Sequence, residues 1–404
     1  MVFYTAISIL ALAALSPTLY SCFQRASIIY QNAPERLLNI DNFKSHEIKF
    51  ADKIRSCEDA LLVESKGLAI VACDPGREQR NTVMGVFIPG EIPNAELFVY
   101  NYKDAGLPDS ESLRQLEIQG FELEEGFHTL GIAYDEETSA LFVTNHRESG
   151  ATIEMFNLDL AAFTAKHFRT IQHPLLRSPN SIALINSHEL LVTSDHYFQI
   201  EKYGILAGVE TYLGLPIASV VHVDISSLLE TPAGDVKATA VAYLPFANGI
   251  DFLNETTVVA ASTSGAAVYF YTITKSDSDT PSAPTLTYES MVKFPFFVDN
   301  LQVSQDGTLF AAGHPHPPSL GKFTATRNTC NDPAKFAAAD PSTQEYCKTG
   351  KAPSWISKWT EARGVEHLYV GSGYPSSTTA AYDSKRNIGI VTGLYAEGLL
   401  IWKS

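Results

Sequence analysis

The sequence predicts an all-β protein, a six-bladed β-propeller preceded by an N-terminal hydrophobic helix. Three observations lead to this prediction: a strand–turn–strand pattern recurs six times, further strand-like runs lie between the recurrences, and helical periodicity is scarce. The chain has 404 residues, of which 45% are hydrophobic and 18% charged, so it can bury a large core. We expect residues 1–24 to form a signal peptide or signal anchor and residues 25–404 to form one propeller domain.

The N-terminal segment differs from the rest of the chain, because residues 2–20 carry no charged side chain. An uncharged stretch of this length lies at the border between the apolar region of a signal peptide and a membrane-spanning helix. The alternative is a buried core helix. We expect entry into the secretory pathway, with the protein secreted or anchored to a membrane through residues 2–20. Whether the segment is cleaved stays open.

Each of the six recurring units consists of a short apolar strand, a polar turn and a second strand rich in β-branched and small residues. The units begin at Ser56, Phe127, Ser178, Phe246, Val298 and Thr378. Their spacing, about 50 to 80 residues, is typical of propeller blades. Runs such as "ATIEMFNLD" and "VVHVDIS" lie between them and can complete four-stranded blades. We expect helices only in insertions, including residues 196–214.

Polar residues stand at the entrance to several of these units, where innermost strands would converge on the propeller axis. They are Glu58 with Asp59, Asn180, Asn248, and Asp299 with Asn300. Unpaired polar groups at a packed axis cost a few kcal/mol each, and carboxylates also repel one another. A hard cation removes both costs, and Ca²⁺ accepts six to eight oxygen ligands. The alternative is that these residues cap independent turns, as Asn and Asp often do.

The charge and the cysteine spacing argue against several functions. The net charge of −16 and the lack of a basic run argue against nucleic-acid binding. None of the five cysteines forms a CxxC pair, which argues against a zinc knuckle or thioredoxin site. Cys330 and Cys347 bracket a loop-like insertion, and in an oxidising compartment we expect them to form a disulfide; the alternative is two free thiols. Asn254-Glu255-Thr256 is a glycosylation sequon.

The ordered segments "TSDHYF", "ETYLGL" and "FANGI", together with "CED", "LFVTNH", "FVDN" and "GHP", resemble the paraoxonase/arylesterase family from about Ser56 onward. Members of that family are six-bladed propellers with calcium on the axis, and they hydrolyse lactones and aryl esters. The resemblance implies a catalytic calcium held by Glu58, Asn180, Asn248, Asp299 and Asn300. It also implies a second, structural calcium near Asp59 and the backbone carbonyl of Ile132, although Ser181 stands where the family has a carboxylate.

The family's catalytic His directly before Gly-Ile is missing, because Leu130 stands there. The candidate general bases are His146 and His128; on a regular strand, His128 would face the same side as Leu130. We expect His146 to carry most of this role. The predicted function is calcium-dependent hydrolysis of small ester or lactone substrates by activated water. The alternative is a propeller that keeps its metal and binds a ligand or partner without turnover.

Overall fold

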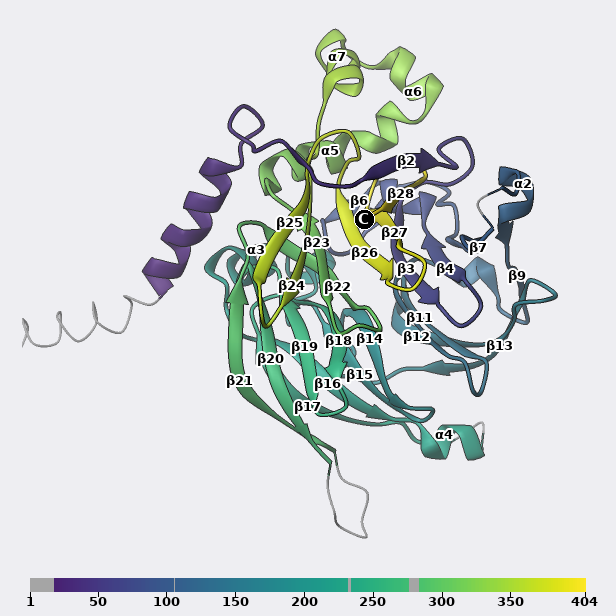
Figure 1. Ribbon diagram of the computed structural model, residues 1–404. Coiled ribbons are helices and arrows are strands. Elements are labelled where there is room, and N and C mark those ends of the chain that lie inside the picture. Colours follow the sequence, from purple (N-terminus) through teal and green to yellow (C-terminus); the bar gives the residue numbers. More distant parts are fainter. Residues whose placement is uncertain (1–17, 105, 232–233, 276–282) are drawn as a thin grey trace, which may run out of the picture.

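The computed structural model describes residues 18–104, 106–231, 234–275 and 283–404, and it confirms the six-bladed propeller (Figure 1). Its strands form six sheets of four or five strands and one short hairpin. Except for one parallel edge strand, neighbouring strands in the blades run antiparallel. Each predicted strand–turn–strand unit supplies the two inner strands of one blade.

The blades follow one another along the chain. Blade 1 contains β3 (Cys57–Val63), β4 (Leu68–Cys73), β7 (Glu96–Asn101) and β8 (Leu113–Gln115). Blade 2 contains β10 (Thr129–Asp135), β11 (Ala140–Arg147), β12 (Gly150–Asp159), β13 (Thr164–Ile171) and the edge strand β9 (Glu117–Gln119). Blade 3 contains β14 (Pro179–Asn186), β15 (Glu189–Ser194), β16 (Ala218–Asp224) and β17 (Lys237–Leu244).

The remaining three blades complete the circle. Blade 4 contains β18 (Ala247–Asn254), β19 (Thr257–Ser262), β20 (Ala267–Thr274) and β21 (Thr285–Lys293). Blade 5 contains β22 (Phe297–Val303), β23 (Leu309–His314), β24 (Ser354–Thr360), β25 (Gly364–Gly371) and the edge strand β1 (Ile40–Asp41). Blade 6 contains β26 (Ser377–Asp383), β27 (Ile388–Gly393), β28 (Leu399–Lys403) and β2 (Ser45–Lys49). Because β2 comes from the N-terminal side, it closes the ring on the last blade.

The innermost strands β3, β10, β14, β18, β22 and β26 each contact the next around the axis, and β26 returns to β3. Buried apolar residues fill the space between each pair of neighbouring blades, giving six separate clusters. In the cluster between blades 5 and 6, for example, Tyr382 and Trp402 stack with ring centroids 4.7 Å apart. Since every blade is buried on both faces, the axis is held rigidly from six sides.

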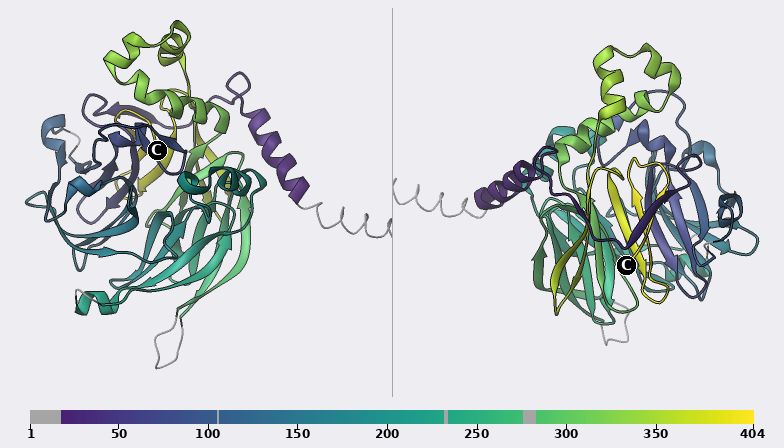
Figure 2. Two further views of the ribbon diagram at one scale, coloured as in Figure 1. Left: turned by 180° about the vertical axis from the view of Figure 1, so that it is seen from behind. Right: turned by 45° about the horizontal axis from the view of Figure 1, so that its top comes forward.

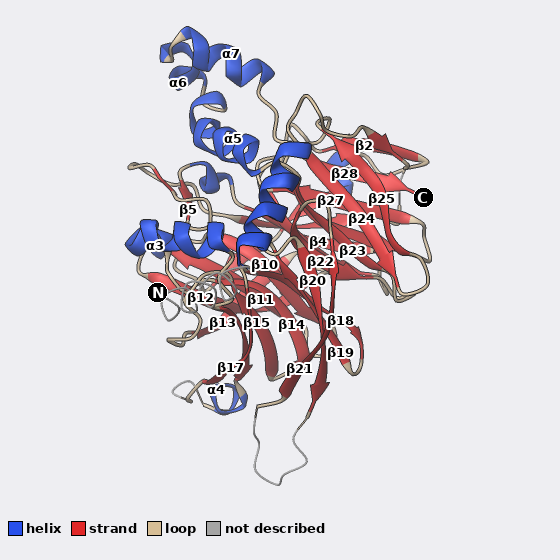
Figure 3. Cartoon of the chain, turned by 90° about the vertical axis from the view of Figure 1, so that its left-hand side faces the viewer, coloured by secondary structure: helices blue, strands red, loops and turns tan. Residues whose placement is uncertain are grey.

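Helices gather mainly on one side of the propeller, as Figures 2 and 3 show. They include residues 18–31, α3 (Ile200–Leu213), α5 (Pro317–Cys330), α6 (Pro333–Ala338) and α7 (Pro341–Thr349). The prediction of a helix within residues 196–214 is confirmed by α3. The connections between strands also contain short helical turns, namely η1 (Pro75–Glu78), α2 (Asp109–Ser112), η2 (Leu123–Glu125) and α4 (Ser226–Glu230), and the hairpin of β5 (Arg80–Asn81) and β6 (Val86–Phe87).

The insertion bracketed by Cys330 and Cys347 was expected to be loop-like, and this prediction is wrong because α6 and α7 occupy most of it. Local signals explain the helices. Asp332 and Asp340 each accept hydrogen bonds from two backbone N–H groups of the helix that follows, and a proline follows each cap. Such an Asp-Pro start satisfies N-terminal donors and fixes the first helical φ.

The structure contains two disulfides. The predicted pair Cys330–Cys347 is confirmed and links α5 to α7. Cys57–Cys73 was not predicted; it joins directly opposed residues of β3 and β4. The remaining cysteine, Cys22, has a free thiol.

Part of the predicted N-terminal segment, residues 1–17, lies outside the described residues. Residues 18–31 form a helix that packs beside α3 and the propeller. Across the part of the chain that the structure describes, no helix is long and apolar enough to cross a membrane.

Candidate functional site

A break in strand register occurs near the start of all six innermost strands. The residues that fall within these breaks are Glu58, Leu130-Gly131, Asn180-Ser181, Asn248-Gly249, Asp299-Asn300 and Thr378-Thr379. A bulge bends the strand locally and redirects side chains that regular alternation would place on one face. The structure therefore puts the predicted polar residues at equivalent places in four blades, and Leu130-Gly131 takes that place in blade 2. Thr378 and Thr379 complete the set in the sixth.

Asn248-Gly249 is also a common turn sequence, yet here it lies inside β18. Its glycine permits close packing around the axis. A Cβ on Gly249 would stand 2.4 Å from the backbone N of Leu301 in the next blade, and a Cβ on Gly131 would stand 2.4 Å from the carbonyl O of Asn180. Because backbone cannot yield as a flexible side chain can, both contacts require glycine.

Four oxygen atoms from four blades are buried at the axis without a hydrogen-bond partner among the described residues. They are Oε2 of Glu58 and the Oδ1 atoms of Asn180, Asn248 and Asn300. Unpartnered buried oxygens are rare in folded proteins because each forfeits its hydration. Asp299, which also lines the axial cavity, adds a carboxylate to this group.

Neighbouring side chains fix the orientation of the three amides. Nδ2 of Asn180 donates to Oδ2 of Asp195 (3.3 Å), and Nδ2 of Asn248 donates to Oγ1 of Thr263 (3.0 Å). Nδ2 of Asn300 donates to Oε1 of Glu58 (2.8 Å) and to Oγ1 of Thr379 (3.0 Å). With each NH₂ group so bound, the amide oxygen is left as the free atom, which is the orientation that a metal ligand requires.

The pKa of Glu58 also agrees with a cation site at the axis. Burial raises the pKa of Glu58 well above its usual value, and the charges of Asp59 and Asp299 raise it further. A cation among these oxygens would reverse that effect and satisfy the four unpartnered atoms. The donor set, two carboxylates and three amides, contains only oxygen and fits Ca²⁺ better than metals that prefer nitrogen or sulfur.

The surroundings of Asp59 differ from those of the first site. Its Oδ1 accepts from N of Ala60 (2.8 Å) and Oγ1 of Thr379 (3.0 Å), and its Oδ2 accepts from N of Ile132 (3.0 Å). Ile132 thus contacts Asp59 through its backbone N–H. The second calcium was expected to bind the backbone carbonyl of Ile132 instead. Protein donors already satisfy both carboxylate oxygens, so the second site lacks the signature of the first and stays a prediction.

A cavity of about 470 Å³ opens above the axial oxygens. Its floor includes Glu58, Asn180, Asn248 and Asp299, and its walls come from the helix at 18–31, α3 and α5. Leu130 lines it, as the resemblance implied. Most of the wall is apolar, which suits an organic substrate whose polar end reaches the floor.

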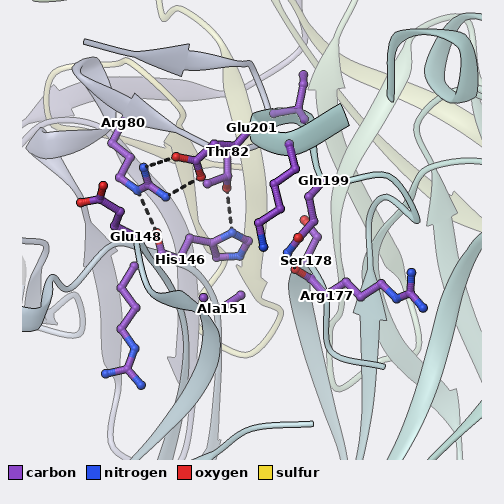
Figure 4. A pocket seen from close by; sticks show the side chains of 13 residues that line it. Arg80, Thr82, His146, Glu148, Ala151, Arg177, Ser178, Gln199 and Glu201 are labelled. Carbon is purple, nitrogen blue, oxygen red and sulfur yellow. Dashed lines mark hydrogen bonds and ion pairs between the residues drawn. The ribbon is translucent and has the colours of Figure 1, made fainter. Parts of the chain in front are cut away.

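His146 lies beside this cavity in a separate pocket, which Figure 4 shows with Arg80, Thr82 and Glu201. Its Nε2 is 2.7 Å from the carbonyl O of Pro179, and its Nδ1 is 2.7 Å from Oγ1 of Thr82. A carbonyl only accepts, so Nε2 carries the proton and Nδ1 accepts from the threonine. Burial lowers the pKa of His146. Both ring nitrogens are therefore engaged, and one holds the peptide that precedes Asn180.

His128 does not share a face with Leu130, contrary to the expectation for a regular strand. His128 precedes β10, Leu130 falls within the register shift between Thr129 and Ile132, and Nδ1 of His128 lies 3.4 Å from Oδ1 of Asp74. The histidine that lines the axial cavity is His314. Its Nε2 lies 2.8 Å from Oδ2 of Asp299, and its buried Nδ1 has no partner among the described residues.

Sequence reasoning noted His314 in "GHP" without giving it a role, and it missed Thr263, Thr378 and Thr379. Thr378 and Thr379 both donate to the backbone carbonyl of Glu58, at 2.6 and 3.0 Å. The signal was present, because "TT" opens the sixth repeat where four of the other repeats carry Asn, Asp or Glu.

Comparison with known proteins gives consistent results. The arylesterase family model matches residues 95–335. Mouse serum paraoxonase/arylesterase 1 is 31% identical over 211 residues, 51% of this chain and 54% of that protein. The match therefore spans about half of that relative's length. Human serum paraoxonase/arylesterase 2 is 29% identical over 296 residues, 70% of this chain and 72% of that protein.

Solved structures with a similar chain course include a gluconolactonase from Xanthomonas campestris and a luciferin-regenerating enzyme. The first has a TM-score of 0.48 and 13% identity, covering 87% of each chain. The second has a TM-score of 0.49 and 12% identity, covering 89% of this chain and 95% of that one.

Proposed function

The chain belongs to the arylesterase family, and from this premise we propose that it is a calcium-dependent hydrolase of lactones and aryl esters. One observation carries the proposal: four buried oxygens on innermost strands of four blades have no partner among the described residues, and three of their residues, Glu58, Asn180 and Asn248, line a mostly apolar cavity. An ester or lactone has an apolar body and one polar carbonyl, which matches that division of the cavity.

Glu58, Asn180, Asn248, Asp299 and Asn300 would hold the metal through their oxygens. When bound, calcium supplies Lewis-acid polarisation of the substrate carbonyl. The protein keeps these ligands in place through the hydrogen bonds to Asp195, Thr263 and Thr379. Because the ligands are already in place, the site does not have to reorganise during the reaction.

For the general base, the geometry favours His314 over His146 and His128. His314 lines the cavity, and Asp299 accepts from its Nε2, which leaves the other ring nitrogen, Nδ1, unprotonated and without a partner among the described residues. Nδ1 takes a proton from the water that attacks the carbonyl, and the imidazolium then returns it to the leaving oxygen. We assign to His146 the positioning of the Pro179–Asn180 peptide.

The second candidate function is a propeller that retains its metal and binds a small ligand without turnover. Leu130 favours it, because an apolar side chain lines the cavity where the family has its catalytic histidine.

Hydrolysis of phenyl acetate and of γ- and δ-lactones, with and without a chelator, separates these functions. We expect calcium-dependent turnover in the wild type and a 10²- to 10⁴-fold lower kcat in His314→Gln. His46→Gln, in edge strand β2, is the matched control. Calcium affinity is measured for each variant, because His314 contacts a proposed ligand. Calcium binding without hydrolysis of any of these substrates would favour the binding function.

His146→Gln separates positioning from proton transfer. If His146 only positions Asn180, the variant weakens calcium binding, and excess calcium restores turnover. A large loss of kcat that persists at saturating calcium would return the base role to His146.

We also propose that the protein enters the secretory pathway and contacts a lipid surface through its helical side. The two disulfides support an oxidising compartment. Large apolar side chains protrude from residues 18–31 and from α3; Phe23 is 71% exposed and Ile205 is 86% exposed. Apolar side chains on two adjacent helices suit the membrane interface.

Flotation with phosphatidylcholine vesicles tests this contact. The double variant Phe23→Ser/Ile205→Ser should lose vesicle binding, whereas Tyr288→Ser, an exposed aromatic on β21, should retain it. Equal binding by all three proteins would refute the assignment of this surface.

A further inference from the structure

The axial cavity contains one cationic side chain among its lining residues, Arg25 from the helix at 18–31. Most of the surrounding wall is apolar. It includes Ile29, Met84, Ile200, Phe246 and Leu320. A charged group facing an apolar wall is costly unless a partner compensates it, so the partners of Arg25 are informative.

These partners are all neutral. Nη1 donates to the carbonyl O of Ser264 (3.4 Å), and Nη2 donates to the carbonyl O of Tyr212 (3.2 Å) and to Sγ of Cys22 (3.1 Å). By contrast, the arginines Arg80 and Arg147 pair with Glu201 and Glu125. Across the described residues, Arg25 forms no ion pair, although the protein carries a net charge of −16. A guanidinium has five N–H donors, so some remain free.

A second cation lies nearby. Nζ of Lys293 donates to the carbonyl O of Gly265 (2.9 Å), next to the Ser264 carbonyl that Arg25 binds. Burial lowers the pKa of Lys293, and the charge of Arg25 lowers it further. Two positive groups therefore bind the turn at Ser264-Gly265, and their hydrogen-bond partners are backbone carbonyls and the Cys22 thiol, all of them neutral. An anion beside them would relieve their repulsion.

The turn at Ser264-Gly265, which Arg25 and Lys293 bind, lies close to Asn248, one of the proposed calcium ligands. Asn248 donates to Oγ1 of Thr263. Ser264 follows Thr263 in the chain, so the Cα atoms of these two residues are about 3.8 Å apart. Both residues line the same cavity as Arg25. One small molecule can therefore place a carbonyl at the axial oxygens and an anionic group at the guanidinium.

We propose that Arg25 determines specificity by binding an anionic group, such as a carboxylate, at the far end of the ester or lactone substrate. This inference rests on the proposed function and adds the substrate class: acyl esters or lactones with an apolar body and a terminal anion. The guanidinium suits this task because its planar N–H groups bind a carboxylate in pairs.

Two 4-nitrophenyl esters of equal acyl length test the inference: the glutarate monoester, which is anionic, and the pentanoate, which is neutral. The readout is the ratio of their kcat/KM values for the full chain in calcium. We expect the wild type to prefer the anionic ester and Arg25→Gln to lower the ratio by about tenfold or more, since a hydrogen bond to a charged group is lost. Arg25→Lys, which keeps the charge, should retain part of the preference.

Arg36→Gln is the matched control, because Arg36 donates to the carbonyl of Tyr30 and does not line the cavity. Its ratio should equal that of the wild type. An unchanged ratio in Arg25→Gln, or a wild type that prefers the pentanoate ester, would overturn the inference.

If neither ester is hydrolysed, the proposed function fails, and calorimetry with glutarate then decides the anion site separately. Glutarate binding that weakens in Arg25→Gln and persists in Arg36→Gln would support the site; equal binding to all three proteins, or no binding to the wild type, would overturn it.

Discussion

Glu154 on β12 and Glu58 on β3 are both buried glutamates of the propeller, yet their surroundings are opposite. Glu154 is fully buried, and its two oxygens accept four side-chain hydrogen bonds, from Thr152 (2.5 Å), Thr170 (2.6 Å), His167 (3.1 Å) and Asn145 (3.3 Å). Burial acts to raise the pKa of Glu154, but these hydrogen bonds outweigh it and lower the pKa. The charge of Glu154 is thus stabilised by the protein alone.

Glu58 receives one side-chain hydrogen bond, on Oε1, while Oε2 has no partner among the described residues. Its pKa is raised by burial and by two neighbouring carboxylates. The same fold therefore satisfies both oxygens of one buried glutamate and leaves one oxygen of the other, like three amide oxygens on neighbouring blades, without a partner among the described residues. This difference distinguishes a structural polar network from a candidate cation site.

Chelation should give the largest effect, because it removes the partner of the whole axial cluster. A ligand present at about 1,000 times its Kd stabilises a protein by about 4 kcal/mol. We expect EDTA to lower the Tm of the wild type strongly, and Asn248→Ala to reduce the difference between calcium and EDTA. Asn157→Ala, at an exposed position of β12, is the control. A wild type with equal Tm in calcium and EDTA would contradict the cation site.

Glu154→Gln should destabilise the protein by about 2 kcal/mol, because charge-assisted hydrogen bonds are lost and their donors remain buried. Unlike the axial variants, it should have the same effect in calcium and in EDTA. Chemical unfolding under both conditions measures this. A loss of stability confined to calcium would mean that the two glutamates belong to one network.

Thr170→Val should cost about 1 kcal/mol, since it removes a single donor to Glu154 without changing the side-chain shape. Thr164→Val on the same strand is the matched control, and it has no recorded side-chain hydrogen bond within the described part of the chain. Equal stability of the two variants would show that the Thr170 hydroxyl contributes nothing to holding Glu154.

The smallest expected effect is on the pH dependence of the metal-free protein. The pKa of Glu58 is raised in the fold, so the native state binds its proton more readily than the unfolded state does. As pH falls from neutral toward the ordinary glutamate pKa, Glu58 becomes protonated in the native state and a destabilising charge is removed. We expect the Tm of the metal-free wild type to rise relative to that of Glu58→Gln over this range.

Calcium should abolish this relative rise, because the bound cation favours ionised Glu58. Glu154 behaves in the opposite way: with a lowered pKa, its contribution is present above the ordinary glutamate pKa and is lost as pH falls through its own. Parallel pH curves for the metal-free wild type and Glu58→Gln would contradict the raised pKa of Glu58.

Much of the fold could be predicted because its signals are local. Apolar alternation, turn residues and the repeat spacing identified all six inner hairpins, and the opening residues of four repeats contain the candidate ligands of the first calcium site. The helices α6 and α7 were missed, although their Asp-Pro starts were visible. Cys57–Cys73 was missed because the pair becomes apparent only once the register of β3 and β4 is known.

The sequence by itself determined the six repeats, the oxygen-rich residues at their entrances and the apolar blades that enclose them. Only the tertiary structure decided which oxygens stay unpartnered and which histidine faces the cavity. The reason is the bulge in each inner strand. A regular strand would put His128 and Leu130 on one face, but His128 precedes β10 and lies beside Asp74, while Leu130 falls within the register shift and lines the cavity. His314 lines the same cavity from the end of β23. Side-chain direction at a bulge depends on pairing between strands, and that pairing joins residues that local sequence patterns do not relate.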